Sequence, residues 1–433
     1  MVGRKILALG SGFLLLWLSG CALTRTQSAS EETDSFLTSL YNPSELSLHP
    51  HYSVFHESEN VSVLYLRAYP AELRFNQANE EAEYRAEMSI SYQLIRLNEE
   101  GQSEALVDSA TVVYRLRQID ELRQAFFASM TIPAATGNHY LLRLEARDVV
   151  RGSRGLEYVY VDKRSLDKSQ NFKVVSLFSG YPKFMNFFTP GEHFTIQYRD
   201  RALDSLVVER FSMTGELPRP PVNSPSDFVF PDVPDTVMML AVGDTADRCM
   251  DLPGMYLVKA RADAEEGLVV FNFGMDFPEI KSPAALMEPL FYLATQAEYR
   301  DLRQEANRKL AVDDYWLDLG TSLEKSRELI RIYYNRVLYS NLYFTTNTEG
   351  WKTDRGMIFI LFGPPNRIRK TGTEEQWYYM SRRKSSVVAF RFERRSDPFS
   401  SEAYEWIRTT ESQSARTEAI QSWRKGRVYA MGN

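Results

Sequence analysis

The sequence predicts an α+β multidomain protein, in which two tandem β-sandwiches precede a helix-rich module with a small antiparallel sheet. Three observations support this prediction. Many segments within residues 60–278 alternate apolar and polar side chains, as β-strands do. Residues 284–344 show helical periodicity and good helix formers. Five of the six tryptophans lie after residue 315, which indicates a separate module with either a large aromatic core or an adhesive aromatic face.

Residues 1–20 predict a lipoprotein signal peptide. Arg4 and Lys5 form a short positive region, and the apolar run after them is shorter than a membrane span. Leu18-Ser19-Gly20-Cys21 resembles the lipobox of bacterial lipoproteins, which implies cleavage before Cys21 and lipid attachment to it. The alternative is an ordinary secretory signal followed by a chance cysteine. Ala22 is similar to the residue at this position in lipoproteins sorted to the outer membrane, so we expect that membrane.

Residues 21–59 predict a tether, because their first half is rich in Ser, Thr and Glu. Phe36, Leu37, Leu40 and Tyr41 have helical spacing, which indicates a short docking helix within it. Lipidation would consume Cys21, leaving Cys249 as the sole free thiol and excluding an intramolecular disulfide. We expect Cys249 to be a small buried apolar residue.

Residues 60–165 predict the first β-sandwich, since short alternating runs are separated by turn sequences. The expected strands are 61–66, 88–94, 111–116, 125–132 and 140–146. Residues 166–282 predict a second one, with a proline-rich loop at 216–234. Its expected strands are 172–176, 194–198, 205–211, 236–241, 256–260 and 268–273.

A weak internal repeat relates the two sandwiches. The segment 137–148 resembles the segment 254–263, and each begins with a glycine shortly before a tyrosine, Tyr140 or Tyr256. We expect each ring to lie in a core and each hydroxyl to bond to backbone. Both units are therefore predicted to be Ig-like, although coincidental strand-end chemistry would give the same pattern.

Residues 283–433 predict the C-terminal α+β domain. Helices are expected over 298–312 and 322–344, the second beginning at Ser322. Strands are expected at 357–362, 375–379 and 387–392, with the helices on one face. Asp354 and Arg355 are expected to fix the loop before the first of these strands through charged hydrogen bonds.

This domain resembles the GWxTD-domain family of bacterial envelope proteins over residues 285–395. The matching signature is Gly350, Trp351, Thr353, Asp354, Arg355, Gly356, Gly363, Pro365, Trp377 and Tyr379, and these are the candidate binding residues. The family implies no catalytic residues. A looser similarity, to small outer-membrane assembly lipoproteins, rests on the Gly-x-Pro turn and the Trp-x-Tyr strand.

The sequence offers no catalytic set, cofactor site or metal site. It contains neither a nucleophile-elbow motif nor a phosphate-binding loop. His49, His51 and His56 could supply metal nitrogens, but surface positions are the simpler interpretation. The paired carboxylates Glu374 and Glu375 are neighbours in sequence and so point in opposite directions on a strand.

Charge is polarised along the chain. Residues 350–433 hold 16 Lys and Arg against 9 Asp and Glu, and the remainder of the mature chain is acidic. Such a basic end favours envelope proteins or anionic envelope components as partners, and export argues against nucleic acid. The expected function is that of a lipid-anchored, non-enzymatic binding or scaffold protein, accessory to outer-membrane assembly or export. The alternative is a glycan-binding or hydrolytic lipoprotein that uses the Trp351, Asp354 and Arg355 region.

Overall fold

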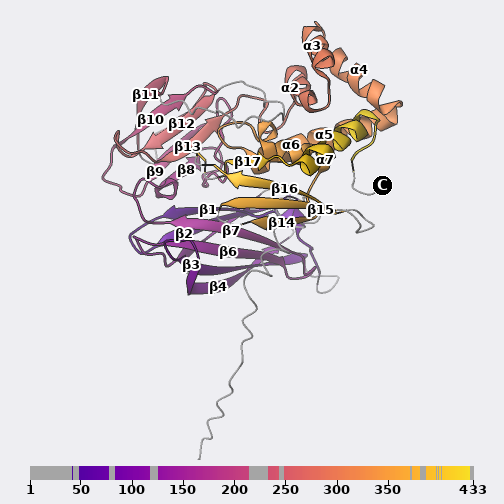
Figure 1. Cartoon of the computed structure of the whole chain (residues 1–433). Coiled ribbons are helices and arrows are strands. Elements are labelled where there is room, and N and C mark those ends of the chain that lie inside the picture. Colours follow the sequence, from indigo (N-terminus) through magenta and orange to yellow (C-terminus); the bar gives the residue numbers. More distant parts are fainter. Residues whose placement is uncertain are drawn as a thin grey trace, which may run out of the picture.

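A computed structural model gives the arrangement of the chain (Figure 1). It describes residue 41 and the ranges 48–77, 83–117, 125–213, 233–242, 248–370, 373–380, 387–395, 397, 399–400 and 402–429. The signal peptide, Cys21, residues 36–40 and most of the proline-rich loop lie outside the described residues. The mixed α+β class is confirmed, with several small antiparallel sheets before a helical region that carries its own small sheet.

The first β unit, residues 48–164, contains two antiparallel sheets that share a core. One sheet has the order β1-β2-β5 and the other the order β4-β3-β6-β7. Leu64 and Ile132 from the first sheet pack with Leu94 and Leu142 from the second. The strands are β1 (His51–His56), β2 (Ser62–Ala68), β3 (Arg85–Leu97), β4 (Ser103–Arg117), β5 (Phe126–Ile132), β6 (His139–Asp148) and β7 (Arg154–Asp162).

The strand β1 corrects the predicted tether, which extended to residue 59. Val54 and Phe55 are buried, and β1 pairs antiparallel with β2 from His51 opposite Arg67 to His56 opposite Ser62. The histidines at both ends obscured the strand in the sequence. His56 is itself fully buried, bonded to the Ser62 hydroxyl and the Asp162 carbonyl, so its expected surface position is wrong.

The second β unit, residues 165–274, places a two-stranded sheet on a four-stranded one. Phe172 and Ile196 of the smaller sheet pack against Leu206, Val208 and Val258 of the larger, whose order is β11-β10-β12-β13. The strands are β8 (Phe172–Ser176), β9 (Phe194–Tyr198), β10 (Ser205–Phe211), β11 (Thr236–Ala241), β12 (Gly254–Lys259) and β13 (Leu268–Asn272). All six expected strands are confirmed.

The repeated tyrosines behave alike, as expected. Tyr140 is buried and its hydroxyl accepts from the Ala135 N–H at 2.9 Å. Tyr256 is buried and its hydroxyl donates to the Leu252 carbonyl at 2.6 Å. Each tyrosine thus ties the entry of a strand to the turn before it.

The C-terminal domain, residues 283–429, begins with helices. They are α2 (Pro283–Met287), α3 (Gln296–Gln304), α4 (Arg308–Gly320), α5 (Leu323–Phe344), α6 (Asp354–Phe362) and α7 (Thr410–Arg424). Short 3₁₀ turns occur at η1 (Pro70–Glu72), η2 (Ser169–Asn171), η3 (Glu288–Tyr292) and η4 (Gly350–Lys352). The predicted start of α5 is confirmed, since the Ser322 hydroxyl accepts from the Lys325 N–H. The single helix predicted over 298–312 is wrong, because Asn307 caps a second helix by accepting from the Leu310 N–H.

The C-terminal sheet has the order β14-β15-β16-β17. Its strands are β14 (Arg367–Lys370), β15 (Glu374–Met380), β16 (Val387–Arg394) and β17 (Tyr404–Ile407). The strand expected at 357–362 is instead helix α6, and every residue from Arg355 to Phe362 is buried. A helix apolar on all sides is stable here because α5, α7 and the sheet enclose it.

The tryptophans form a core rather than an adhesive face. Trp316, Trp351, Trp377, Trp406 and Trp423 are all buried in one cluster. This domain also contacts both β units: Phe399 packs on Phe211 and Met255 of the second, and Tyr158 of the first packs against the C-terminal core. The domains are therefore packed together.

Candidate functional site

The signature segment forms the N-terminal cap of helix α6. The Thr353 hydroxyl accepts from the Gly356 N–H at 3.0 Å and donates to the Gly350 carbonyl at 2.7 Å. Thr353 is thus the N-cap residue, and Asp354 occupies the first turn, where a carboxylate favours the helix dipole.

Two glycines of the signature permit close backbone contacts. A Cβ atom on Gly350 would lie 1.9 Å from the Ser340 carbonyl oxygen of α5. A Cβ atom on Gly356 would lie 1.9 Å from the Gly350 carbonyl oxygen. Side chains at either position would force α5, η4 and α6 apart, so glycine is required for close approach rather than for turn geometry.

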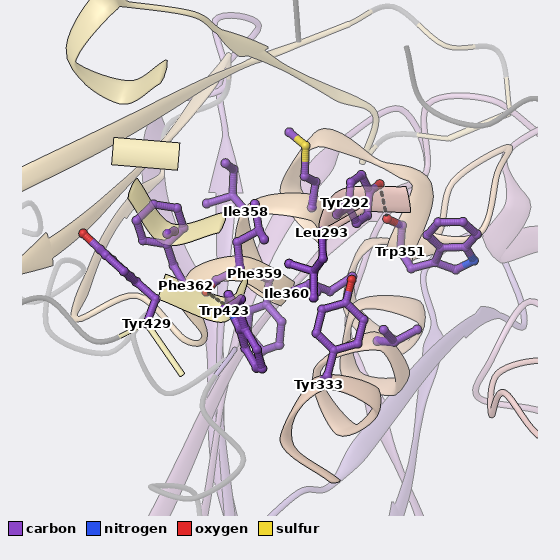
Figure 2. Packing of buried hydrophobic residues seen from close by; sticks show 14 of the residues in the cluster. Tyr292, Leu293, Tyr333, Trp351, Ile358, Phe359, Ile360, Phe362, Trp423 and Tyr429 are labelled. Atoms are coloured by element: carbon purple, nitrogen blue, oxygen red, sulfur yellow. Dashed lines mark hydrogen bonds between the residues drawn. The ribbon is translucent and has the colours of Figure 1, made fainter. Parts of the chain in front are cut away.

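Trp351 joins three elements of the domain. The residue is 2% exposed. Its backbone N–H donates to the Asn341 side-chain oxygen at 3.0 Å, and its backbone carbonyl accepts from the Tyr292 hydroxyl at 2.7 Å. Figure 2 shows Tyr292 bonded to this residue, within the buried cluster that also contains Tyr333 and Trp423. The residue therefore fixes η4 to α5 and η3.

The sequence predicted that Asp354 fixes its own loop, but its carboxylate bonds to strand β17 instead. Its carboxylate accepts from the Trp406 N–H at 2.8 Å and faces Arg408 at 3.3 Å. Burial raises the pKa of this carboxyl, while Arg408 and the Trp406 N–H oppose the shift. The carboxylate thus links the start of α6 to β17, an edge strand of the C-terminal sheet.

Arg355 lies at the centre of a buried charge cluster. Its guanidinium pairs with Glu375 at 3.0 Å and donates to the Glu402 carbonyl at 2.6 Å. It also stacks over the Tyr404 ring, 4.3 Å from the centroid. At the rim of the cluster, Lys370 pairs with the Glu402 carboxylate at 3.0 Å. Because the charges are paired, the cluster is consistent with a structural role.

Glu375 is the residue that sequence reasoning missed. It is fully buried, and its second oxygen accepts from the Trp377 indole N–H at 2.6 Å. The sequence did contain a signal: Glu375, Trp377 and Tyr379 share the inward phase of one strand, so a carboxylate among aromatic core residues required a cation. Arg355 is that cation.

The remaining signature residues close the C-terminal end of α6. Gly363 caps the helix with φ of 83°, and its carbonyl accepts from the Tyr379 hydroxyl at 2.8 Å. Arg336 donates to the Ile360 carbonyl at 2.9 Å, and the Trp423 indole donates to the Leu361 carbonyl at 2.9 Å. Pro365 is buried just beyond the cap. Gly363 and the prolines therefore end a helix rather than the expected strand.

These positions restrict what the segment can do chemically. Stacking of a sugar requires an exposed ring face, and Trp351, Trp377 and Tyr379 are all buried. The hydroxyl groups of the signature are bonded to backbone, and its charged groups are bonded to backbone and to Arg408 and Glu375, which lie outside the signature. The structure brings all ten predicted residues into one region around α6, where they act as a framework.

Other candidate residues lie elsewhere. His49 is hydrogen-bonded to Glu72, and across the part of the chain that the structure describes no group of three or more His, Cys, Asp or Glu could hold a metal ion. Cys249 is exposed, with its thiol 3.1 Å from the Asp251 carboxylate, so the expected buried position is wrong. Within the described ranges, no helix is long and apolar enough to cross a membrane.

Comparison with protein families identifies the class of this region: residues 254–425 form a GWxTD domain. The matched region begins in β12 and so extends beyond the residues that carried the sequence resemblance. A comparison with curated proteins gives no match.

Among solved structures, one match is a Bacteroides uniformis β-glucuronidase 2 covalently bound to cyclophellitol-6-carboxylate aziridine. It is 13% identical, covers 33% of this chain and has a TM-score of 0.17. This chain spans only 15% of that one, and the likeness supports no statement about fold or activity.

Proposed function

We propose that this protein is a lipid-anchored lipoprotein of the bacterial cell envelope, attached to the outer membrane through Cys21. It acts as a non-enzymatic binding or scaffold protein, accessory to outer-membrane assembly or export. The lipobox-like segment before Cys21 and the GWxTD domain at residues 254–425 support the envelope assignment. The basic C-terminal region supports an anionic envelope component or an acidic protein as partner.

The observation that carries the binding role is the edge of strand β4, which among the described strands pairs with β3 alone. This strand spans Ser103–Arg117 and is hydrogen-bonded to β3 at one edge of its sheet, with apolar side chains in solvent. Leu106 is 59% exposed and Val113 is 49% exposed. An edge strand of this length with exposed apolar side chains can accept a strand from a partner protein.

We also propose that the two β units are Ig-like sandwiches related by duplication. Support comes from the hydroxyls of Tyr140 and Tyr256, which bond to backbone five and four residues upstream. Ig-type domains have a comparable tyrosine corner. Modules of this kind commonly serve as binding surfaces.

The anchor is tested by metabolic labelling with a palmitate analogue in cells that express the full chain or its Cys21→Ser variant. We expect label and membrane association in the first and neither in the second. A soluble, unlabelled full chain would refute the anchor. Separation of inner and outer membranes then identifies the membrane concerned.

The binding role is tested by affinity purification from detergent-solubilised membranes, with quantitative mass spectrometry. We expect a stoichiometric partner that is lost in the double variant Leu106→Lys and Val113→Lys. The matched control is Ser109→Lys, which adds charge to the same strand without removing an apolar side chain. A partner that survives both changes equally would show that β4 is not the binding edge.

A further inference from the structure

Tyr41 lies in the core of the C-terminal domain, although it precedes both β units in the chain. Its ring is 8% exposed and belongs to the same cluster as the buried tryptophans. The ring centroid is 4.9 Å from that of Phe344 and 5.5 Å from those of Tyr343 and Trp377. Three rings from α5 and β15 therefore form an aromatic pocket, occupied by a residue from the N-terminal segment.

The polar surroundings of Tyr41 are the buried charge cluster of the signature. Glu375, Lys370, Arg355 and Glu402 all act electrostatically on its hydroxyl, and burial is the main cause of its raised pKa. The buried phenol thus lies close enough to the charge cluster to feel its charges. Phe344, Trp377, Arg355 and Glu375 are all fully or almost fully buried beside it.

We propose that this aromatic pocket, formed by Tyr343, Phe344 and Trp377, is an intramolecular docking site for the N-terminal segment, with Tyr41 as its anchor. The GWxTD domain is then completed by a residue that lies outside residues 254–425. This attachment at Tyr41, a strap, holds the chain to the GWxTD domain ahead of β1.

The strap has a mechanical consequence. Any force or constraint applied to the chain before residue 41 acts directly on α5 and β15, without passing through the β units. If Cys21 carries a lipid, as proposed above, nineteen residues lie between it and Tyr41. Their maximum span is about 70 Å, so the GWxTD domain would remain within that distance of the bilayer. The docking itself does not depend on lipidation, so either proposal can fail alone.

Contact is tested directly in the full chain by placing the photo-crosslinker benzoylphenylalanine at position 41. We expect crosslinks to peptides that contain residues 339–344 or 374–380, identified by mass spectrometry. The matched control has the same crosslinker at position 160, where Tyr160 is 59% exposed on β7. Crosslinks from position 41 only to other regions would overturn the proposal. Crosslinks between isotopically light and heavy chains in a mixture would overturn its intramolecular form and indicate exchange between copies.

The contribution of the ring is tested by hydrogen exchange in the full chain. In Tyr41→Ala we expect amides in β15 and the end of α5 to exchange at least tenfold faster, whereas Tyr160→Ala leaves them unchanged. Added p-cresol, which replaces the missing side chain, is expected to restore protection in Tyr41→Ala. Exchange in Tyr41→Ala that equals the Tyr160→Ala control would contradict the docking role. If the alanine variant does not fold, Tyr41→Leu, which retains part of the apolar volume, is compared with the Tyr160→Ala control by the same exchange measurement.

Discussion

Two buried cations show how differently the first β unit and the GWxTD domain accommodate charge. Arg355 of the GWxTD domain pairs with the buried Glu375 carboxylate. Lys163 of the first β unit is equally buried but donates to three backbone carbonyls, those of Ser58, Val61 and Ala134. One region compensates charge with charge, and the other compensates it with peptide dipoles.

The pKa values follow this difference. Burial lowers the pKa of the Lys163 amine to about 8, with a smaller contribution from Arg199. Burial also disfavours the charged form of Arg355, but Glu375 and other neighbours hold its pKa above the usual value. Disruption of the carboxylate pair should therefore cost more than removal of the lysine, because it leaves a full charge without a partner.

The largest expected effect is that of Arg355→Met. It leaves the Glu375 carboxylate buried without its guanidinium, and we expect the free energy of unfolding to fall by about 3–5 kcal/mol. Urea denaturation followed by circular dichroism measures this. The double variant Arg355→Met with Glu375→Gln is the control and should lose less than the single variant, since the charge is removed as well. A double variant no more stable than the single one would contradict the charge-pair explanation.

The next largest effect is expected for Lys163→Met, which keeps the apolar stem. All three bonds are lost, but the Val61 carbonyl still accepts from the Glu57 and Ser58 N–H groups, so the cost falls mainly on the Ser58 and Ala134 carbonyls. We expect a loss of about 2 kcal/mol. The same measurement on Lys281→Met, at an exposed lysine, should change stability by less than about 0.5 kcal/mol. Equal losses in Lys163→Met and Arg355→Met would remove the contrast between the two regions.

Glu157→Gln tests how the first β unit accommodates a buried acidic group. Glu157 in β7 pairs with Leu144 across the sheet and has no ion-pair partner among the described residues, and burial raises its pKa to about 8. The folded state therefore keeps the proton between about pH 4.5 and 8, so wild-type stability falls as pH rises through this window. The glutamine variant should gain about 1–2 kcal/mol over wild type at pH 8 and little at pH 4. Thermal melts across this range measure the gain, and a gain independent of pH would argue against a protonated Glu157.

The smallest effect is expected for Glu298→Gln, which weakens the link between α3 and α7. Arg424 donates to both oxygens of Glu298 at 2.6 and 2.8 Å, and these bonds lower the pKa of the carboxyl to about 2. Because the folded pKa is depressed, the pair stabilises above about pH 4.5 and is lost as pH falls towards 2. The pair is partly exposed, so we expect only about 0.5–1 kcal/mol at pH 7. Denaturation at pH 7 and pH 2 should show the difference at the higher pH alone.

The sequence could predict the elements and contacts that depend on residues close together in the chain. Alternation predicted β2 to β6 of the first β unit and all six strands of the second, and the glycine shortly before each tyrosine predicted the ring burial and backbone bonds of Tyr140 and Tyr256. Ser322 predicted the start of α5, because an N-cap hydroxyl acts on the N–H groups that follow it at once.

Prediction of secondary structure from the local sequence pattern failed where tertiary contacts determine the element. Residues 357–362 are six apolar residues in a row, which suits a buried helix as well as a buried strand, and only enclosure by α5, α7 and the sheet selects the helix. The strand β1 was hidden because it ends in a histidine, His56, which is buried against the distant Asp162 carbonyl. In both cases the determining contact is made by residues far away in the chain.

The GWxTD signature also has features that the sequence determines and features that only the tertiary structure determines. The sequence alone determined which residues belong to it. Only the tertiary structure paired Arg355 with Glu375, bonded Asp354 to β17 and placed Tyr41 in the aromatic pocket. The reason is physical: a cap or a turn acts over a few peptide units, whereas a buried charge or ring finds its partner only when the whole chain has folded.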